Sequence, residues 1–83
     1  MENTLRLEKT VIYIRLLDEG VPVTRPTCAE ILGGNIFCIL PTKNYDSGDE
    51  TWEFTPGMVV RCEKRKSPEG KEALVAVAAY KQE

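Results

Sequence analysis

The sequence predicts one small all-β domain, built as a barrel or sandwich of five to six short antiparallel strands. Turn-forming residues recur roughly every 8–12 residues along the chain. The runs between these turns are rich in β-branched and aromatic residues, and they lack the apolar stripe of an amphipathic helix. A chain of 83 residues can bury one hydrophobic core and not two, so residues 1–83 are expected to form a single domain.

Each predicted strand combines strand-favouring residues with a turn signal at its end. The strands cover residues 10–18, 21–31, 36–40, 52–54, 58–66 and 71–80. Pro22 and Pro26 cannot donate a backbone hydrogen bond, so the second strand is expected at a sheet edge or with a bulge near Pro26. A short helix over residues 29–32 is an alternative for the end of that strand. The last strand is expected to pair with residues 58–66 because the loop between them is short.

Five segments carry turn or loop chemistry, and the first is the turn at Asp18-Glu19-Gly20. Gly33-Gly34-Asn35 predicts a tight hairpin, because glycine and asparagine tolerate the positive φ that such turns need. Thr55-Pro56-Gly57 predicts a second tight turn. Residues 67–70 form a hairpin loop, and the polar residues 42–51 a long exposed loop.

Composition argues against the commonest kinds of chemistry. The chain contains no histidine, which removes the most frequent general base and metal ligand, and we expect neither an enzyme nor a metal site. Cys28, Cys38 and Cys62 are odd in number and too widely spaced for zinc, which favours reduced, buried thiols. No motif indicates a cofactor. With no apolar run long enough to span a membrane, we expect a cytoplasmic protein.

Aromatic and arginine side chains are the candidate binding residues, because these types dominate interfaces. They are Tyr13, Arg15, Arg25, Tyr45 and Trp52. Two of them have a structural alternative: Trp52 in the core, and Arg25 paired with Asp18 or Glu30 at the rim. The net charge of −2 argues weakly against nucleic acid.

A nucleic-acid-binding barrel is nevertheless the alternative function, and it requires basic side chains on one face. Those residues are Arg15, Arg61, Lys64, Arg65 and Lys66, with Lys71 near the same hairpin. Acidic neighbours are interspersed among them, which is more typical of a solvated strand edge.

Three strands are apolar on both faces. In the first, Ile12, Ile14 and Leu16 point to one side, while Val11, Tyr13 and Leu17 point to the other. A small barrel has only one inside, and monomers seldom expose a large apolar patch. The surplus face therefore predicts cover from residues 5–7 or from a second subunit, most simply in a two-fold homodimer.

The runs RLLDEGVPVTRP (residues 15–26) and WEFTPGMVVRC (residues 52–62) resemble a set of small uncharacterised bacterial proteins. Some of these proteins are encoded on mobile elements such as integron gene cassettes. The F-x-P-G-x-V-V stretch is similar to the strand entry of SH3-like barrels, so the resemblance implies that fold and no assigned chemistry. We therefore expect a small non-catalytic binding or oligomerisation module that acts through the apolar face and the candidate binding residues. Its expected partners are a second copy of the chain or another protein.

Overall fold

The computed structural model describes residues 8–41, 48, 50–66 and 70–80. Within these residues there are six strands and no helix, which confirms the all-β class. The strands are β1 (Lys9–Leu17), β2 (Thr24–Gly33), β3 (Ile36–Ile39), β4 (Thr51–Trp52), β5 (Val59–Lys66) and β6 (Glu72–Ala79). The alternative helix at residues 29–32 is wrong, because β2 continues as a strand through Gly33, where it pairs with β3.

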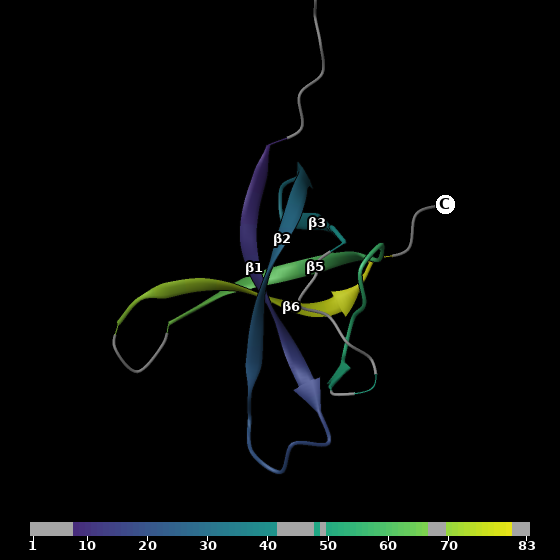
Figure 1. The fold of residues 1–83 in the computed structure, drawn as a ribbon. Helices are drawn as coiled ribbons and strands as arrows, with labels where there is room; N and C mark the ends of the chain where they lie inside the picture. The colour runs from purple at the N-terminus through teal and green to yellow at the C-terminus, as the bar shows by residue number, and fades with distance from the viewer. Residues whose placement is uncertain (1–7, 42–47, 49, 67–69, 81–83) are drawn as a thin grey trace, which may run out of the picture.

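Five of the strands close into a ring in the order β1, β2, β3, β5, β6 and back to β1 (Figure 1). The first four contacts in this ring are antiparallel, and the closing contact between β6 and β1 is parallel, with Tyr13 opposite Val75. When an odd number of strands alternate in direction, the first and last must run the same way. The predicted small barrel is confirmed, with one parallel contact in place of uniformly antiparallel pairing.

Two long hairpins form the frame of this ring. Figure 1 shows the β1–β2 ribbon and the β5–β6 ribbon crossing near their middles, with each ribbon extending as an arm beyond the crossing. The predicted pairing of the last strand with β5 is confirmed over Val60 to Lys66. The short β4 lies outside the ring and pairs with the end of β1, where Trp52 lies opposite Leu16.

The core lies inside the ring and takes alternate residues from each strand. Its members are Ile12, Ile14, Leu16, Ala29, Phe37, Ile39, Trp52, Phe54, Val60, Cys62 and Ala76. Trp52 and Phe54 lie on one face and are both buried, at 4% and 7% exposure. The intervening Glu53 is only half-buried, as the aromatic-polar-aromatic pattern requires.

Pro26 lies in the half of β2 that is paired on one side only. Pro26 lies opposite Tyr13 in the pairing of β2 with β1, whereas β3 pairs with β2 only from Ala29 onward. The backbone N–H of Leu16 donates to the carbonyl of Val23 at 2.9 Å, and in an antiparallel pair such bonds recur at every second residue. The nitrogen of Pro26 therefore faces the unpaired side and no ladder bond is lost. The predicted edge position holds for this half of β2, whereas β3 makes the other half internal.

Two predicted turns have the backbone geometry that their residues favour. Gly34 between β2 and β3 has φ of 54°, and Gly57 between β4 and β5 has φ of 94°. In the second turn the N–H of Met58 donates to the carbonyl of Thr55 at 3.1 Å, with Pro56 and Gly57 at the two central positions. The Gly57 N–H also donates to Ile39 at 2.7 Å, which ties the turn to β3.

One polar side chain in the core has no partner within the described residues. The hydroxyl of Thr27 is buried, and none of these residues forms a hydrogen bond with it. A buried hydroxyl without a partner costs about 1–3 kcal/mol, and valine has nearly the same shape without the hydroxyl.

We therefore expect Thr27→Val to raise the free energy of unfolding by about 1 kcal/mol. Urea denaturation followed by the fluorescence of the single tryptophan measures this change. The control is Thr24→Val at the exposed start of the same strand, which should change stability by no more than a few tenths of that amount. A Thr27→Val variant less stable than the natural protein would contradict the expectation.

Candidate functional site

The predicted binding residues do not gather into one site. Tyr13 is half-buried on the outward side of β1, opposite Pro26. Arg15 and Arg25 make ion pairs with different carboxylates, and Trp52 lies in the core. Tyr45 lies outside the described residues. Sequence therefore identified side chains that belong to separate places in the fold.

Glu50 joins Arg25 to Trp52. The Arg25 Nε donates to Glu50 Oε2 at 2.6 Å, and its Nη2 contacts the same oxygen. The indole Nε1 of Trp52 donates to the other carboxylate oxygen at 3.1 Å. Hydrogen bonds from Arg25 and then from Trp52 lower the pKa of Glu50 below its ordinary value of 4.5. Glu50 thus links β2 to β4 through Arg25 and Trp52.

The predicted partners of Arg25, Asp18 and Glu30, are replaced by Glu50. Side chains alternate along β2, so Arg25 and Glu30 stand on opposite faces and cannot meet. The core position of Trp52 leaves its ring closed to a ligand, and the N–H at its edge donates to Glu50.

We expect Glu50→Gln to destabilise the protein in a pH-dependent way. Because the pKa of Glu50 is lowered on folding, its contribution to stability is present above pH 4.5 and is lost as pH falls through the lowered value. The stability difference between Glu50→Gln and the natural protein should thus be constant near neutrality and shrink in acid. Urea denaturation from pH 7 to pH 3 measures it, with Glu72→Gln, an exposed site on β6, as the control. A difference that does not change with pH would count against this role.

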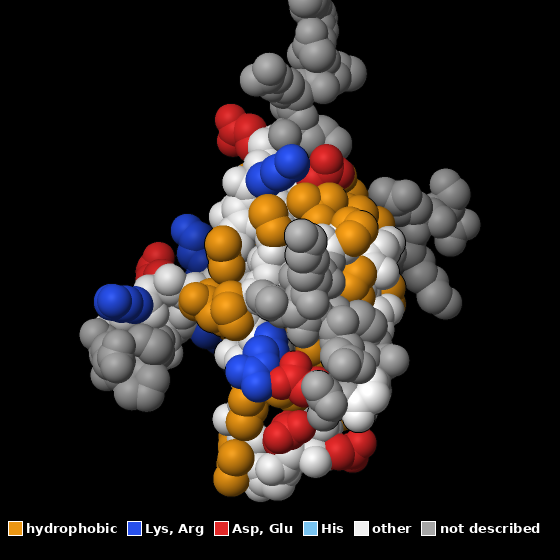
Figure 2. Space-filling view, viewed as in Figure 1, with side chains coloured by type: hydrophobic (Ala, Val, Ile, Leu, Met, Phe, Trp, Pro, Cys, Tyr) orange, Lys and Arg blue, Asp and Glu red, His pale blue; other side chains and the backbone are white. Residues whose placement is uncertain are grey.

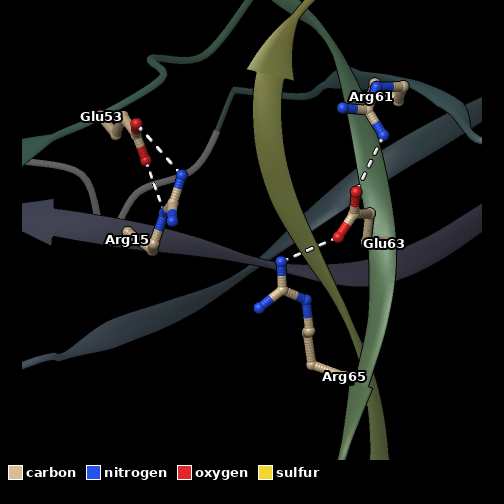
Figure 3. A network of polar contacts seen from close by, with 5 residues as sticks. All are labelled: Arg15, Glu53, Arg61, Glu63 and Arg65. Carbon is tan, nitrogen blue, oxygen red and sulfur yellow. Dashed lines mark hydrogen bonds and ion pairs between the residues drawn. The ribbon is translucent and has the colours of Figure 1, made fainter.

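Two further carboxylates are shared among three arginines (Figure 3). Glu53 accepts from Arg15 Nε at 2.8 Å and from Arg15 Nη2 at 3.2 Å, a bidentate pair. Glu63 accepts from Arg65 at 2.8 Å and from Arg61 at 3.1 Å, and these bonds lower its pKa. The five side chains carry three positive and two negative charges, so the network is left with one excess positive charge.

The basic run at the end of β5 does not converge as a nucleic-acid surface requires. Arg61, Glu63 and Arg65 share one face of the strand, and alternation puts Lys64 and Lys66 on the other. The two carboxylates of the network also neutralise most of the arginine charge. Arg15 and Arg65, however, border a common space.

That space is a shallow hollow of about 210 Å³ between the two arms. Pro22 and Val23 form one apolar wall and Val75 and Val77 on β6 the other, with Arg15 and Arg65 also in the lining. Figure 2 shows basic side chains where the left arm meets the lower one. Of these residues, Arg15 was predicted from sequence as a binding residue, and Arg15 and Arg65 as part of a nucleic-acid face. The sequence pattern indicates that the last strand is apolar on its outward side, but it does not indicate that Val75 and Val77 lie close to Arg15. That closeness results from the crossing of the two hairpins.

A second surface feature is the apolar outward face of β3. Phe37 and Ile39 point into the core, so Ile36 and Cys38 point outward, and both are half-buried. Cys38 lies opposite Glu30 on β2 and Val59 on β5, and Ile36 lies opposite Arg61. Figure 2 shows apolar side chains gathered over the upper part of the molecule, where Figure 1 places β2 and β3. We call these positions of β2, β3 and β5 the β3 face.

The three thiols differ in exposure, which corrects the prediction that all are buried. Cys62 is fully buried, Cys38 half-buried and Cys28 exposed, because Thr27 and Ala29 take the inward positions on either side of Cys28. Burial raises the pKa of Cys62 from 9.0 to about 11, which lowers its thiolate fraction about 100-fold. Cys62 is therefore a core residue and a poor nucleophile.

We expect a thiol reagent such as Ellman's reagent to modify Cys28 rapidly at pH 8 and Cys62 only as fast as the protein unfolds. Peptide mapping by mass spectrometry assigns the modified residue at each time. Equal rates for the two thiols in the folded protein would contradict this order, and addition of urea should remove it.

Comparison with known proteins adds no relative. No family model, curated protein or solved structure matches this chain. Across residues 8–41, 48, 50–66 and 70–80, no three His, Cys, Asp or Glu side chains lie close enough together to hold a metal ion. In the same part of the chain no helix has the length and apolar character needed to cross a membrane. The resemblance to integron-encoded proteins stays a prediction.

Proposed function

We propose that this protein is a small non-catalytic binding and oligomerisation module that pairs with a second copy of itself through the β3 face. The observation that carries this proposal is the outward apolar row on β3. Ile36 and Cys38 are only half-buried within the chain, and Val59 continues the row on β5. Tyr80 lies next to Val59, because its backbone N–H donates to the Val59 carbonyl at 2.9 Å. The Tyr80 side chain is 45% exposed.

The charges beside this row favour a second copy as the partner. Glu30 on β2 is half-buried and makes no ion pair with any described residue. The Arg61 side chain on β5 is 44% exposed, and its carboxylate partner, Glu63, also pairs with Arg65. A two-fold axis parallel to β3 places β2 of one copy over β5 of the other. Glu30 of each copy then lies near Arg61 of its partner, offset along the strand by the two residues that separate Ile36 from Cys38. A two-fold interface makes this contact twice.

Charge reversal tests the pairing directly. The natural protein should sediment as a dimer at micromolar concentration, and Glu30→Arg or Arg61→Glu alone should weaken the dimer about tenfold or more. The double variant E30R/R61E restores opposite charges across the two-fold axis and should recover the dimer. Analytical ultracentrifugation measures each constant, and circular dichroism verifies that each variant folds.

An apolar pair of variants tests the row itself. Ile36→Glu should give a monomer, whereas Val21→Glu at the 65% exposed position in the β1–β2 turn should leave the dimer intact. A natural protein that is monomeric throughout would overturn the proposal. A dimer that tolerates Ile36→Glu, or that the double variant fails to restore, would assign the interface to another surface.

A nucleic-acid-binding barrel is the alternative function, and the convergence of Arg15 and Arg65 on one hollow is the observation that favours it. Titration with single-stranded RNA at two salt concentrations tests it, because binding by phosphate contacts weakens steeply with salt. The separation of Lys64 and Lys66 from the arginines, together with the pairing of Glu53 and Glu63, counts against this alternative.

A further inference from the structure

We infer that the hollow between the two arms is a docking site for an acidic peptide segment of another protein, which inserts one apolar side chain beside a carboxylate. This inference is independent of the proposed self-association. The hollow is lined by residues of β1, β5, β6, the start of β2 and the β1–β2 turn, and none of them belongs to the β3 face. It can hold whether the chain is a monomer or a dimer.

The size of the hollow decides what can enter it. Its volume of about 210 Å³ lies below the roughly 300–1,000 Å³ of sites that enclose small molecules. It equals the share of about seven water molecules, which is sufficient for one aliphatic side chain. The walls that such a side chain would meet are Pro22 and Val23 on one side and Val75 and Val77 on the other. The hollow therefore suits an anchor residue rather than a whole small ligand.

The charge of the rim selects an acidic neighbour for that anchor. Arg65 donates to Glu63 through one Nη2 contact, and its Nε has no partner among the described residues. Its side chain is 57% exposed. Glu63 is divided between Arg65 and Arg61, which leaves the excess positive charge of the network beside the hollow. A carboxylate next to the anchor residue can bind Arg65 without displacing Glu63.

The lining also favours a peptide over a nucleic acid. No aromatic ring belongs to the described lining, and proteins that bind single strands stack bases on aromatic side chains. The carboxylates of Glu53 and Glu63 stand beside the arginines and would repel a chain of phosphates. A peptide needs only one carboxylate at Arg65.

The test is an NMR titration of the ¹⁵N-labelled natural protein with four blocked peptides. Each has glycines flanking a central triplet: Glu-Leu-Glu, the neutral Gln-Leu-Gln, the cationic Lys-Leu-Lys, or Glu-Gly-Glu without the anchor. Only Glu-Leu-Glu should shift the amide signals of Val23, Thr24, Arg65, Val75 and Val77 with saturation in the millimolar range. Absence of saturation with Glu-Leu-Glu, or equal binding of the other triplets, would overturn the inference.

Matched variants localise the effect. Arg65→Gln should weaken binding roughly tenfold, and Lys66→Gln, the neighbouring basic residue on the other side of the strand, should leave it unchanged. Thr24→Trp adds bulk at the exposed rim of the hollow and should also block binding without touching the core. If poly-uridylate shifts the same signals with steep salt dependence while Glu-Leu-Glu does not, the site binds nucleic acid and the peptide inference is wrong.

Discussion

Burial of the even-numbered side chains of β1 is the constraint on which the rest of the structure depends. Ile12 and Ile14 are fully buried and Leu16 nearly so. Among the described strands, β1 is also the one that pairs with three others: β2 along its length, β6 at Tyr13 and β4 at its end. Because a strand alternates, this inward row fixes which residues of β1 face outward, including Arg15.

Because the strands close into a ring, the alternation of side chains also determines which residues form the outer surfaces. The β5–β6 hairpin crosses the β1–β2 hairpin where β6 meets β1, and the arms that extend past the crossing leave the hollow between them. On the other side of the ring, β3 sends Phe37 and Ile39 inward and must therefore send Ile36 and Cys38 outward. Both proposed interaction surfaces are consequences of a barrel too small to have two apolar interiors.

Carboxylates near the rim add polar links between elements that also meet in the core. Glu50 links β2 to the indole of Trp52, and Glu53 links β4 to Arg15. Nothing in the sequence indicates which arginines come near these two carboxylates. Exposed ion pairs contribute little to stability individually, so their main effect is to orient arginine side chains. The network around Glu63 acts similarly on Arg61 and Arg65.

The sequence by itself determined the approximate strands, two of the tight turns and most of the inward residues of this protein, because these depend on local properties. Alternation places Ile12 and Ile14 in the core, and Gly34 and Gly57 accept positive φ. Pro26 marks the stretch of β2 that is paired on one side only. Only the tertiary structure decided the parallel closure of the ring, the partner of Arg25 and the hollow. Each of these depends on contacts between residues far apart in the chain, and local residue patterns carry no record of the angle at which the two hairpins cross.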